Sequence, residues 1–525
     1  MISFFSNILN VLIFFPLLGV LIIAFVPREK TQVLKALALI FFLLEAFFSL
    51  HIYFHFTNTG VIDQFMINLP WIGAWNIHYL LGIDGVSMLL VILTAFTMPL
   101  ALIGTWNSVG QGIKFYLISL LFLETGMVGV FCALDLFLFY VFWEVMLIPM
   151  YFLIGIWGGE NRVYASLKFF IYTMAGSVLM LVALLYLYFK AGRTFNLLEL
   201  YNYRLTSMAQ LWVFGALAFA FAIKVPLFPF HTWLPDAHVQ APTAGSVILA
   251  GVLLKMGTYG FFRFAIPLFP DATLYLQPYL IGIALIGIVY GALVAMVQPD
   301  MKKLIAYSSV SHMGVVMLGL FSLNQTAMTG GLYQMLNHAV STGALFLLVG
   351  MLYDRTHTRM ISDYSGLARL MPVYTVFFMI ITLSSIGVPL TNGFVGEFLT
   401  LLGTFQANRA AAIIGATGVI LGAVYMLWLV ERVFFGEPKH THGLGADLNL
   451  REVLVMSVMV FFVFWMGIYP KPLLNKLERA TETVLLKLED EREMALLTEQ
   501  SSVTGQSGTH WSDLRPLVLS LCKMP

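Results

Sequence analysis

Four ionisable residues lie in the middle of long apolar segments: Glu144, Lys224, Lys255 and Glu397. A charge at the centre of a bilayer costs about 2.5–3.5 kcal/mol on insertion scales, so four such residues without a role would be expensive. In surroundings of low polarity, lysine and glutamate both lose part of their preference for the charged form, which lets them exchange protons near neutral pH. The pattern therefore predicts a path for protons.

Further residues extend this row of charges. His312 and His338 lie within apolar segments of the second half of the chain. Glu124 lies nearer the end of its segment, and His231 follows Lys224 by seven residues. A single histidine on an apolar face is more often a packed core residue than a proton carrier, and polar side chains also join helices inside membranes. Both interpretations, a proton relay and a structural role, are open for each residue.

By residue type, His231, Asp236 and His238 could also bind a metal ion. Their proline-containing loop favours structural hydrogen bonding instead. The sequence has no paired-cysteine motif, haem attachment site, phosphate-binding loop or dinucleotide fingerprint. We therefore predict neither a metal nor a cofactor site in this chain, and we expect Asp84 to cap a helix.

The composition indicates an integral membrane protein. Of 525 residues 60% are hydrophobic and 10% are charged, whereas a soluble chain has about 25% charged residues. The mean hydropathy is +0.88. The formal net charge of +1 carries no information about partners, and we expect no nucleic-acid partner for this chain. The expected solvent for most of the surface is the lipid bilayer.

The elements that must position the charges are membrane-spanning helices of about 20 residues each. We predict an all-α protein with about fourteen of them. They span residues 8–26, 33–56, 84–105, 113–133, 134–157, 165–189, 209–235, 242–266, 276–298, 303–321, 327–353, 371–402, 411–435 and 452–470. Two contain proline within the span, at KVPLFP (224–229) and, together with glycine, at GVPLTNG (387–393). Proline removes a backbone hydrogen bond, so both helices should break there, next to a cavity.

A weak internal repeat relates the two halves. Val225-Pro-Leu matches Val388-Pro-Leu, and Val247-Ile-Leu matches Val419-Ile-Leu. The matching groups of five helices begin an odd number of spans apart, so the second copy should be inverted. The predicted units are helices one to three (1–112), two five-helix repeats (113–270 and 271–436), a last helix (437–474) and a polar tail (475–525).

The loops predict an orientation. Those on one side carry fourteen Lys and Arg residues, including Lys302, and those on the other carry five, including Arg263. The positive-inside rule therefore places both termini on the periplasmic or an equivalent side. Residues 475–500 should form a charged helix, and 501–516 a loop rich in Ser, Gly and Thr.

Four motifs carry a family resemblance: FWEVMLIPMY (142–151), KVPLFPFHTWLPDAH (224–238), APTAGSVILAG (241–251) and NGFVGEF (392–398). They resemble the antiporter-like, proton-pumping subunits of respiratory complex I, and the likeness covers about residues 80–435. Glu397 stands where the sibling chains L and N carry lysine. The chain is therefore most similar to the remaining branch, which has glutamate there. The polar end from about residue 475 departs from the family.

This resemblance implies roles. Glu144 and Lys224 would form a gating pair, Lys255 the central relay, and His312, His338 and Glu397 the second half of the path. The protein would work as a translocase subunit without redox chemistry of its own, in a bacterial inner membrane between chains L and N. NADH, FMN, iron–sulfur clusters and quinone would bind to partner subunits.

Three alternatives are open at this point. The chain could be a subunit of a multi-subunit sodium/proton antiporter, although those chains resemble L and N in carrying lysine at the position of Glu397. It could belong to a ferredoxin-linked photosynthetic relative of complex I. It could also be a membrane scaffold in which buried charges only hold helices together.

Overall fold

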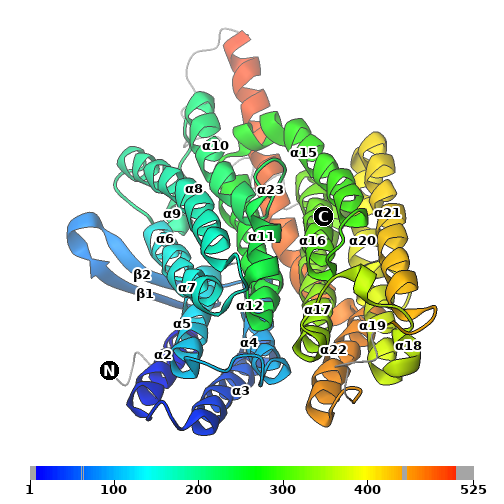
Figure 1. Cartoon of the computed structure of the whole chain (residues 1–525). Helices are drawn as coiled ribbons and strands as arrows, with labels where there is room; N and C mark the ends of the chain where they lie inside the picture. The colour runs from blue at the N-terminus through cyan, green and yellow to red at the C-terminus, as the bar shows by residue number, and fades with distance from the viewer. Residues whose placement is uncertain (1–6, 59, 61, 63, 440–445, 504–525) are drawn as a thin grey trace.

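The computed structural model describes residues 7–58, 60, 62, 64–439 and 446–503, and most of them are helical (Figure 1). Thirteen of the described helices are long and apolar enough to cross a membrane. They are α2 (Ile8–Phe25), α3 (Thr31–His55), α4 (Gly85–Gly104), α5 (Ile113–Cys132), α6 and α7 together (Leu136–Val145 and Leu147–Trp157), α8 (Arg162–Lys190), α10 (Ser207–Lys224), the segment Thr243–Leu268, α15 (Pro270–Met296), α16 (Met301–Phe321), α17 (Gln325–Thr356), α21 (Arg409–Phe434) and α22 (Leu450–Ile468).

Both predicted helix breaks are present. Helix α10 ends at Lys224 and the chain becomes helical again in α11 (Trp233–Gln240). Helix α19 (Pro372–Ser385) is followed, after a turn, by α20 (Asn392–Ala407). Each of these last two is too short to span alone, and together they form the fourteenth span. The inverted repeat and the division into units stay predictions.

The span that carries Lys255 is less regular than expected. The sequence predicts one helix over 242–266. Instead, α13 (Leu254–Gly260) lies between two π-helical turns, Leu249–Leu253 and Phe261–Ala265. Short π turns inside helices are rare and are frequent at functional sites. A Cβ at Gly257 would lie 2.7 Å from the Phe221 carbonyl oxygen, so glycine allows α13 to pack closely against the end of α10.

A β-hairpin that the sequence analysis did not predict covers one end of the bundle. Strand β1 (Gln64–Ile72) pairs antiparallel with β2 (Ile77–Ile83). The backbone N–H of His78 donates to Asp135, the capping residue of α6, at 3.0 Å. The hairpin is therefore attached to the helices by a specific contact.

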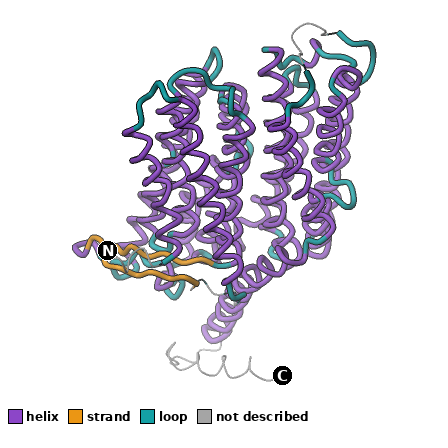
Figure 2. The backbone as a smooth tube through the Cα atoms, turned by 90° about the horizontal axis from the view of Figure 1, so that it is seen from below, coloured by secondary structure: helices purple, strands orange, loops and turns teal. Residues whose placement is uncertain are grey.

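The charged tail forms a longer helix than predicted, α23 (Lys471–Val503). Figure 2 shows it at the same end of the bundle as the hairpin. Its backbone accepts hydrogen bonds from Asn58 at 2.6 Å and from Gln325 at 2.7 Å, and its Lys487 donates to the Tyr201 carbonyl at 2.7 Å. Residues 504–525, which include most of the predicted loop, lie outside the described part of the chain.

An ion pair is buried near this end. Asp84 caps α4 as predicted, by accepting from the Ser87 N–H at 2.9 Å. It also lies 2.5 Å from Arg263, and both side chains are almost fully buried. Counting Arg263 among the loop residues was therefore wrong. Its guanidinium reaches inward from the second π turn to a counter-charge on another helix.

We expect Asp84→Ala to destabilise the fold by about 3–5 kcal/mol, because it leaves the Arg263 charge buried and unpaired. The loss should appear as a lower midpoint temperature for unfolding of the purified protein in detergent. Glu437→Ala is the matched control, since its pair with Arg369 is exposed and should contribute only about 0–1 kcal/mol. Equal midpoints for the two variants would contradict this role of the pair.

Candidate functional site

Four of the predicted residues form one continuous line. They come from four helices: Lys255 from α13, His338 from α17, His312 from α16 and Glu397 from α20. Lys255 Nζ lies 2.7 Å from His338 Nδ1 and also donates to the Ala250 carbonyl. The rings of His338 and His312 are 6.1 Å apart, and His312 Nδ1 lies 3.0 Å from Glu397 Oε1. All four side chains are buried.

Polar groups from α17 hold the far end of this line. Gln334 donates to Glu397 Oε1 at 3.1 Å, and Asn337 donates to Gln334 at 2.8 Å. Two cavities of about 10 Å³ adjoin His312, one beside Glu397 and the other beside His338. This volume is about that of one water molecule, and polar groups line both cavities. The site can therefore hold water between charged groups that do not touch.

The predicted gating pair is apart in this structure. Glu144 lies near the end of α6, next to Ser177, and Lys224 is the last residue of α10. In the described part of the chain, Lys224 Nζ has neither a hydrogen-bond partner nor an ion pair. It lies 5.1 Å from the centre of the Trp143 ring and 5.8 Å from that of Phe169. Glu144 and Lys224 still interact electrostatically, and their role as a gate stays a prediction.

The two halves of the row are not joined by a direct contact. Among the described residues, no hydrogen bond links Lys224 to Lys255. The close packing at Gly257 nevertheless brings their helices together.

Glu124 is deeply buried and faces a residue that the sequence analysis missed. Glu45 on α3 and Glu124 on α5 are both fully buried. Their carboxyl groups interact with each other, and none of the four oxygens has a hydrogen-bond partner among the described residues. The signal was available, because Glu45 lies in the middle of the apolar segment 33–56, as Glu144 does within its own.

The three possible metal ligands do not converge. His231 lies among aromatic rings, 5.2 Å from Tyr290, while Asp236 pairs with Lys168 at 2.7 Å. The His238 ring stacks on Phe346. No group of three His, Cys, Asp or Glu side chains in the described chain could hold a metal ion.

His231 and His238 each have ring nitrogens that can take part in proton transfer. Neither nitrogen of either residue has a hydrogen-bond partner in the part that the structure describes. His238 interacts electrostatically with Lys255 and with Lys302, a buried lysine that donates to the Ala241 carbonyl at 2.6 Å. The sequence analysis placed Lys302 in a loop, and only the packing of α16 against the end of α11 shows its burial.

Residues 133–467 match the family described as NADH:quinone oxidoreductase/Mrp antiporter, transmembrane. NADH-quinone oxidoreductase subunit M of Rhodobacter capsulatus is 46% identical over 483 residues, which cover 89% of this chain and 94% of the relative. NADH-ubiquinone oxidoreductase chain 4 of Marchantia polymorpha is 44% identical over 474 residues, covering 90% and 95%.

The fold has a close counterpart among solved structures. A chain of respiratory complex I from Thermus thermophilus with bound NADH superposes with a TM-score of 0.84. It is 34% identical, and the match covers 92% of this chain and 99% of that one.

Proposed function

The chain belongs to the family of NADH:quinone oxidoreductase and Mrp antiporter transmembrane subunits, and from this premise we propose that it carries protons across the membrane along its buried glutamates, lysines and histidines. It is an antiporter-like membrane subunit of complex I. Its relatives are named subunit M or chain 4, which confirms the branch that the glutamate at position 397 predicts. A sodium/proton antiporter has weaker support, because these relatives carry complex I names.

The line from Lys255 to Glu397 is the observation that carries the proposal. A protonated Lys255 can donate to His338 Nδ1 directly. The 6.1 Å between the histidine rings is too long for a hydrogen bond but suits one bridging water in the adjoining cavity. His312 Nδ1 then lies within hydrogen-bonding distance of Glu397. Each step moves one proton between a named donor and a named acceptor, without a formal charge being created in lipid.

The first half of the path would load Lys255. Lys224 lies on aromatic rings with no hydrogen-bond partner in the described chain, so its charge has only weak, cation–π stabilisation there. When Glu144 approaches, the ion pair would hold the proton on Lys224; when the two separate, the proton would be released towards Lys255. Glu124 and His231 would supply protons from the side. The separated arrangement described above corresponds to the releasing state.

The remaining functions would come from other subunits. Complex I subunits are this chain's partners, and we place chains L and N on either side of it. NADH, FMN, the iron–sulfur clusters and quinone would bind in partner subunits, whose reaction supplies the energy. The proposed location is a bacterial inner membrane, with both termini on the periplasmic side.

The proposal is tested at Lys255. Lys255→Met should leave complex I assembled and reduce NADH-driven proton uptake into membrane vesicles by about 10²-fold, as loss of a positioned proton-transfer group does. Lys30→Met is the matched control, because Lys30 is exposed at the start of α3. Normal pumping by the Lys255 variant, normalised to assembled complex on a native gel, would exclude the relay.

At the end of the line, Glu397→Lys is expected to keep partial pumping, because lysine also carries a proton and the related chains L and N use it there. The activity should fall below that of the wild type, since Gln334 donates to the Glu397 carboxylate and cannot do so to an ammonium group. Initial rates of proton uptake would measure the difference. Loss of the assembled complex would show instead that Glu397 is needed for packing.

A further inference from the structure

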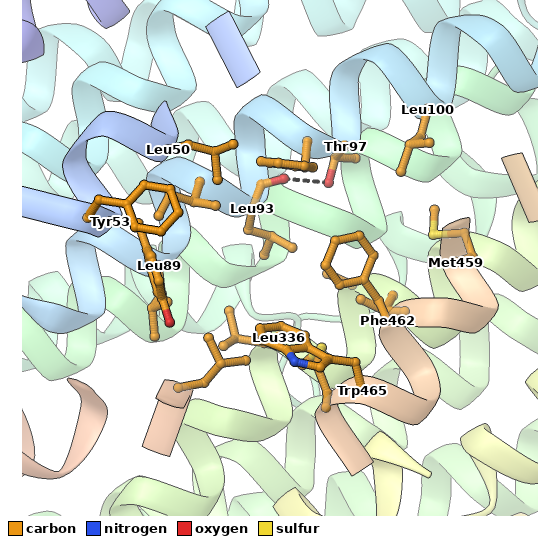
Figure 3. Close-up of a pocket in the computed structure, with 17 residues that line it drawn as sticks. Leu50, Tyr53, Leu89, Leu93, Thr97, Leu100, Leu336, Met459, Phe462 and Trp465 are labelled. Atoms are coloured by element: carbon orange, nitrogen blue, oxygen red, sulfur yellow. Dashed lines mark hydrogen bonds between the residues drawn. The ribbon is translucent and has the colours of Figure 1, made fainter. Parts of the chain in front are cut away.

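An apolar groove opens on the membrane-facing side between α3, α4, α17 and α22 (Figure 3). Its volume is about 250 Å³, and almost all of its lining atoms are apolar. Leu93 and Thr97 form one wall, and Phe462 and Trp465 form the opposite one. All four helices are among the membrane spans. The groove therefore lies at the depth of the predicted membrane spans.

Two side chains with polar tips lie at the end of the groove that α23 covers. They are Tyr53 and Trp465, and Leu473 of α23 lies beside them. One turn further along α23, Lys476 Nζ lies 5.9 Å from the centre of the Tyr53 ring and donates to the Phe56 carbonyl at 3.3 Å. In the described part of the chain Lys476 forms no ion pair, so its charge is free to bind an anion.

We propose that this groove binds one phospholipid, with an acyl chain between α4 and α22 and the phosphate on Lys476. Tyr and Trp are enriched at the level of the lipid headgroups, and lysine there extends its amine to the same level. The three residues mark where a headgroup would lie, and the apolar walls begin directly below them. The binding site thus matches both parts of the ligand, and this inference does not depend on the proton path.

The occupant of the groove has to match a positive charge at one end and apolar walls along the rest. A phospholipid has both parts in one molecule. An apolar helix of a neighbouring subunit would leave the Lys476 charge without a counter-charge.

The lipid would lie directly behind the relay. Leu336, Ala339 and Val340 of α17 line the groove, and His338 lies between them in the sequence. From the opposite wall, the Thr97 side chain packs against Gly251 of the first π turn, next to Lys255. An acyl chain in the groove would fill space against α17, which carries His338, and against α4, which packs on the span that carries Lys255.

The experiment uses the whole complex reconstituted with phosphatidylglycerol that carries a photoreactive diazirine in its acyl chain. After illumination, labelled peptides are mapped by mass spectrometry, and label is expected on the groove residues of α4 and α22. Lys476→Gln should weaken capture about tenfold in competition with unlabelled phosphatidylglycerol, because a hydrogen bond to a charged group is lost. Lys471→Gln, an exposed lysine on the same helix, is the matched control and should leave capture unchanged.

A second variant tests the acyl-chain site separately. Leu93→Trp fills the groove and should remove label from α22, whereas Leu293→Trp, on the exposed face of α15, should not. Labelling that neither Lys476→Gln nor Leu93→Trp alters would overturn the proposal. So would a photo-crosslinker at position 93 that captures a peptide of another subunit. Equal capture of a diazirine diglyceride by wild type and Lys476→Gln is expected, because that probe has no phosphate; a tenfold loss with it would overturn the phosphate contact.

Discussion

Lys224→Ala is expected to reduce NADH-driven proton pumping by about 10²-fold while the complex still assembles. Its amine has no hydrogen-bond partner among the described residues, so its removal leaves no polar group unpaired. The aromatic rings of Trp143 and Phe169 that surround it would remain packed. Proton uptake into vesicles and quinone reduction should fall together, because the two are coupled.

Lys224→Arg separates charge from proton transfer. Guanidinium keeps the positive charge but does not release its proton at accessible pH. We therefore expect this variant to pump almost as poorly as Lys224→Ala. Full activity would mean that a fixed charge is sufficient at this position, and the relay role of Lys224 would be excluded.

The second large effect is expected at Glu144. Glu144→Gln removes the carboxylate that would return to Lys224 and hold its proton, so it should disable loading about as severely as Lys224→Ala. The double variant should then be little worse than either single variant. If the residues acted independently, two losses of about 10² each would multiply to about 10⁴.

The measurement is proton uptake by both single variants and the double variant, normalised to assembled complex. Ser177→Ala is a useful control, because Ser177 lies next to Glu144 but carries no exchangeable charge. Losses that multiply would show that Glu144 and Lys224 are not one switch. The gating pair, which the structure shows apart, would then have no functional support.

Much of the architecture follows from local sequence. Apolar length predicts the spans, and proline predicts the breaks after Lys224 and Ser385, because the backbone effect of proline does not depend on distant contacts. Isolated charges in apolar segments identified the members of the Lys255–Glu397 line. The order in which these side chains follow one another along the line came from the structure.

The features that were missed depend on contacts between distant segments. Arg263 lies near the end of its span, where a basic residue is usually part of a loop. Only its pair with Asp84 on another helix makes it a buried residue. The two π turns beside Lys255 have no clear sequence signal, since they replace an α-helix without proline. The β-hairpin was missed because its strands alternate weakly between polar and apolar residues.

Helix α23 limits the motion of the two halves of the protein relative to each other. Many transporters work by rocking one half of the molecule against the other around a central site. Here the single helix α23 is hydrogen-bonded to both halves. Its partners are the Tyr201 carbonyl in one half and Gln325, at the start of α17, in the other. Rocking of one half against the other would have to break these hydrogen bonds in every cycle. The proposed proton path would instead work within a stationary frame, in which only side chains, water and short backbone turns change position.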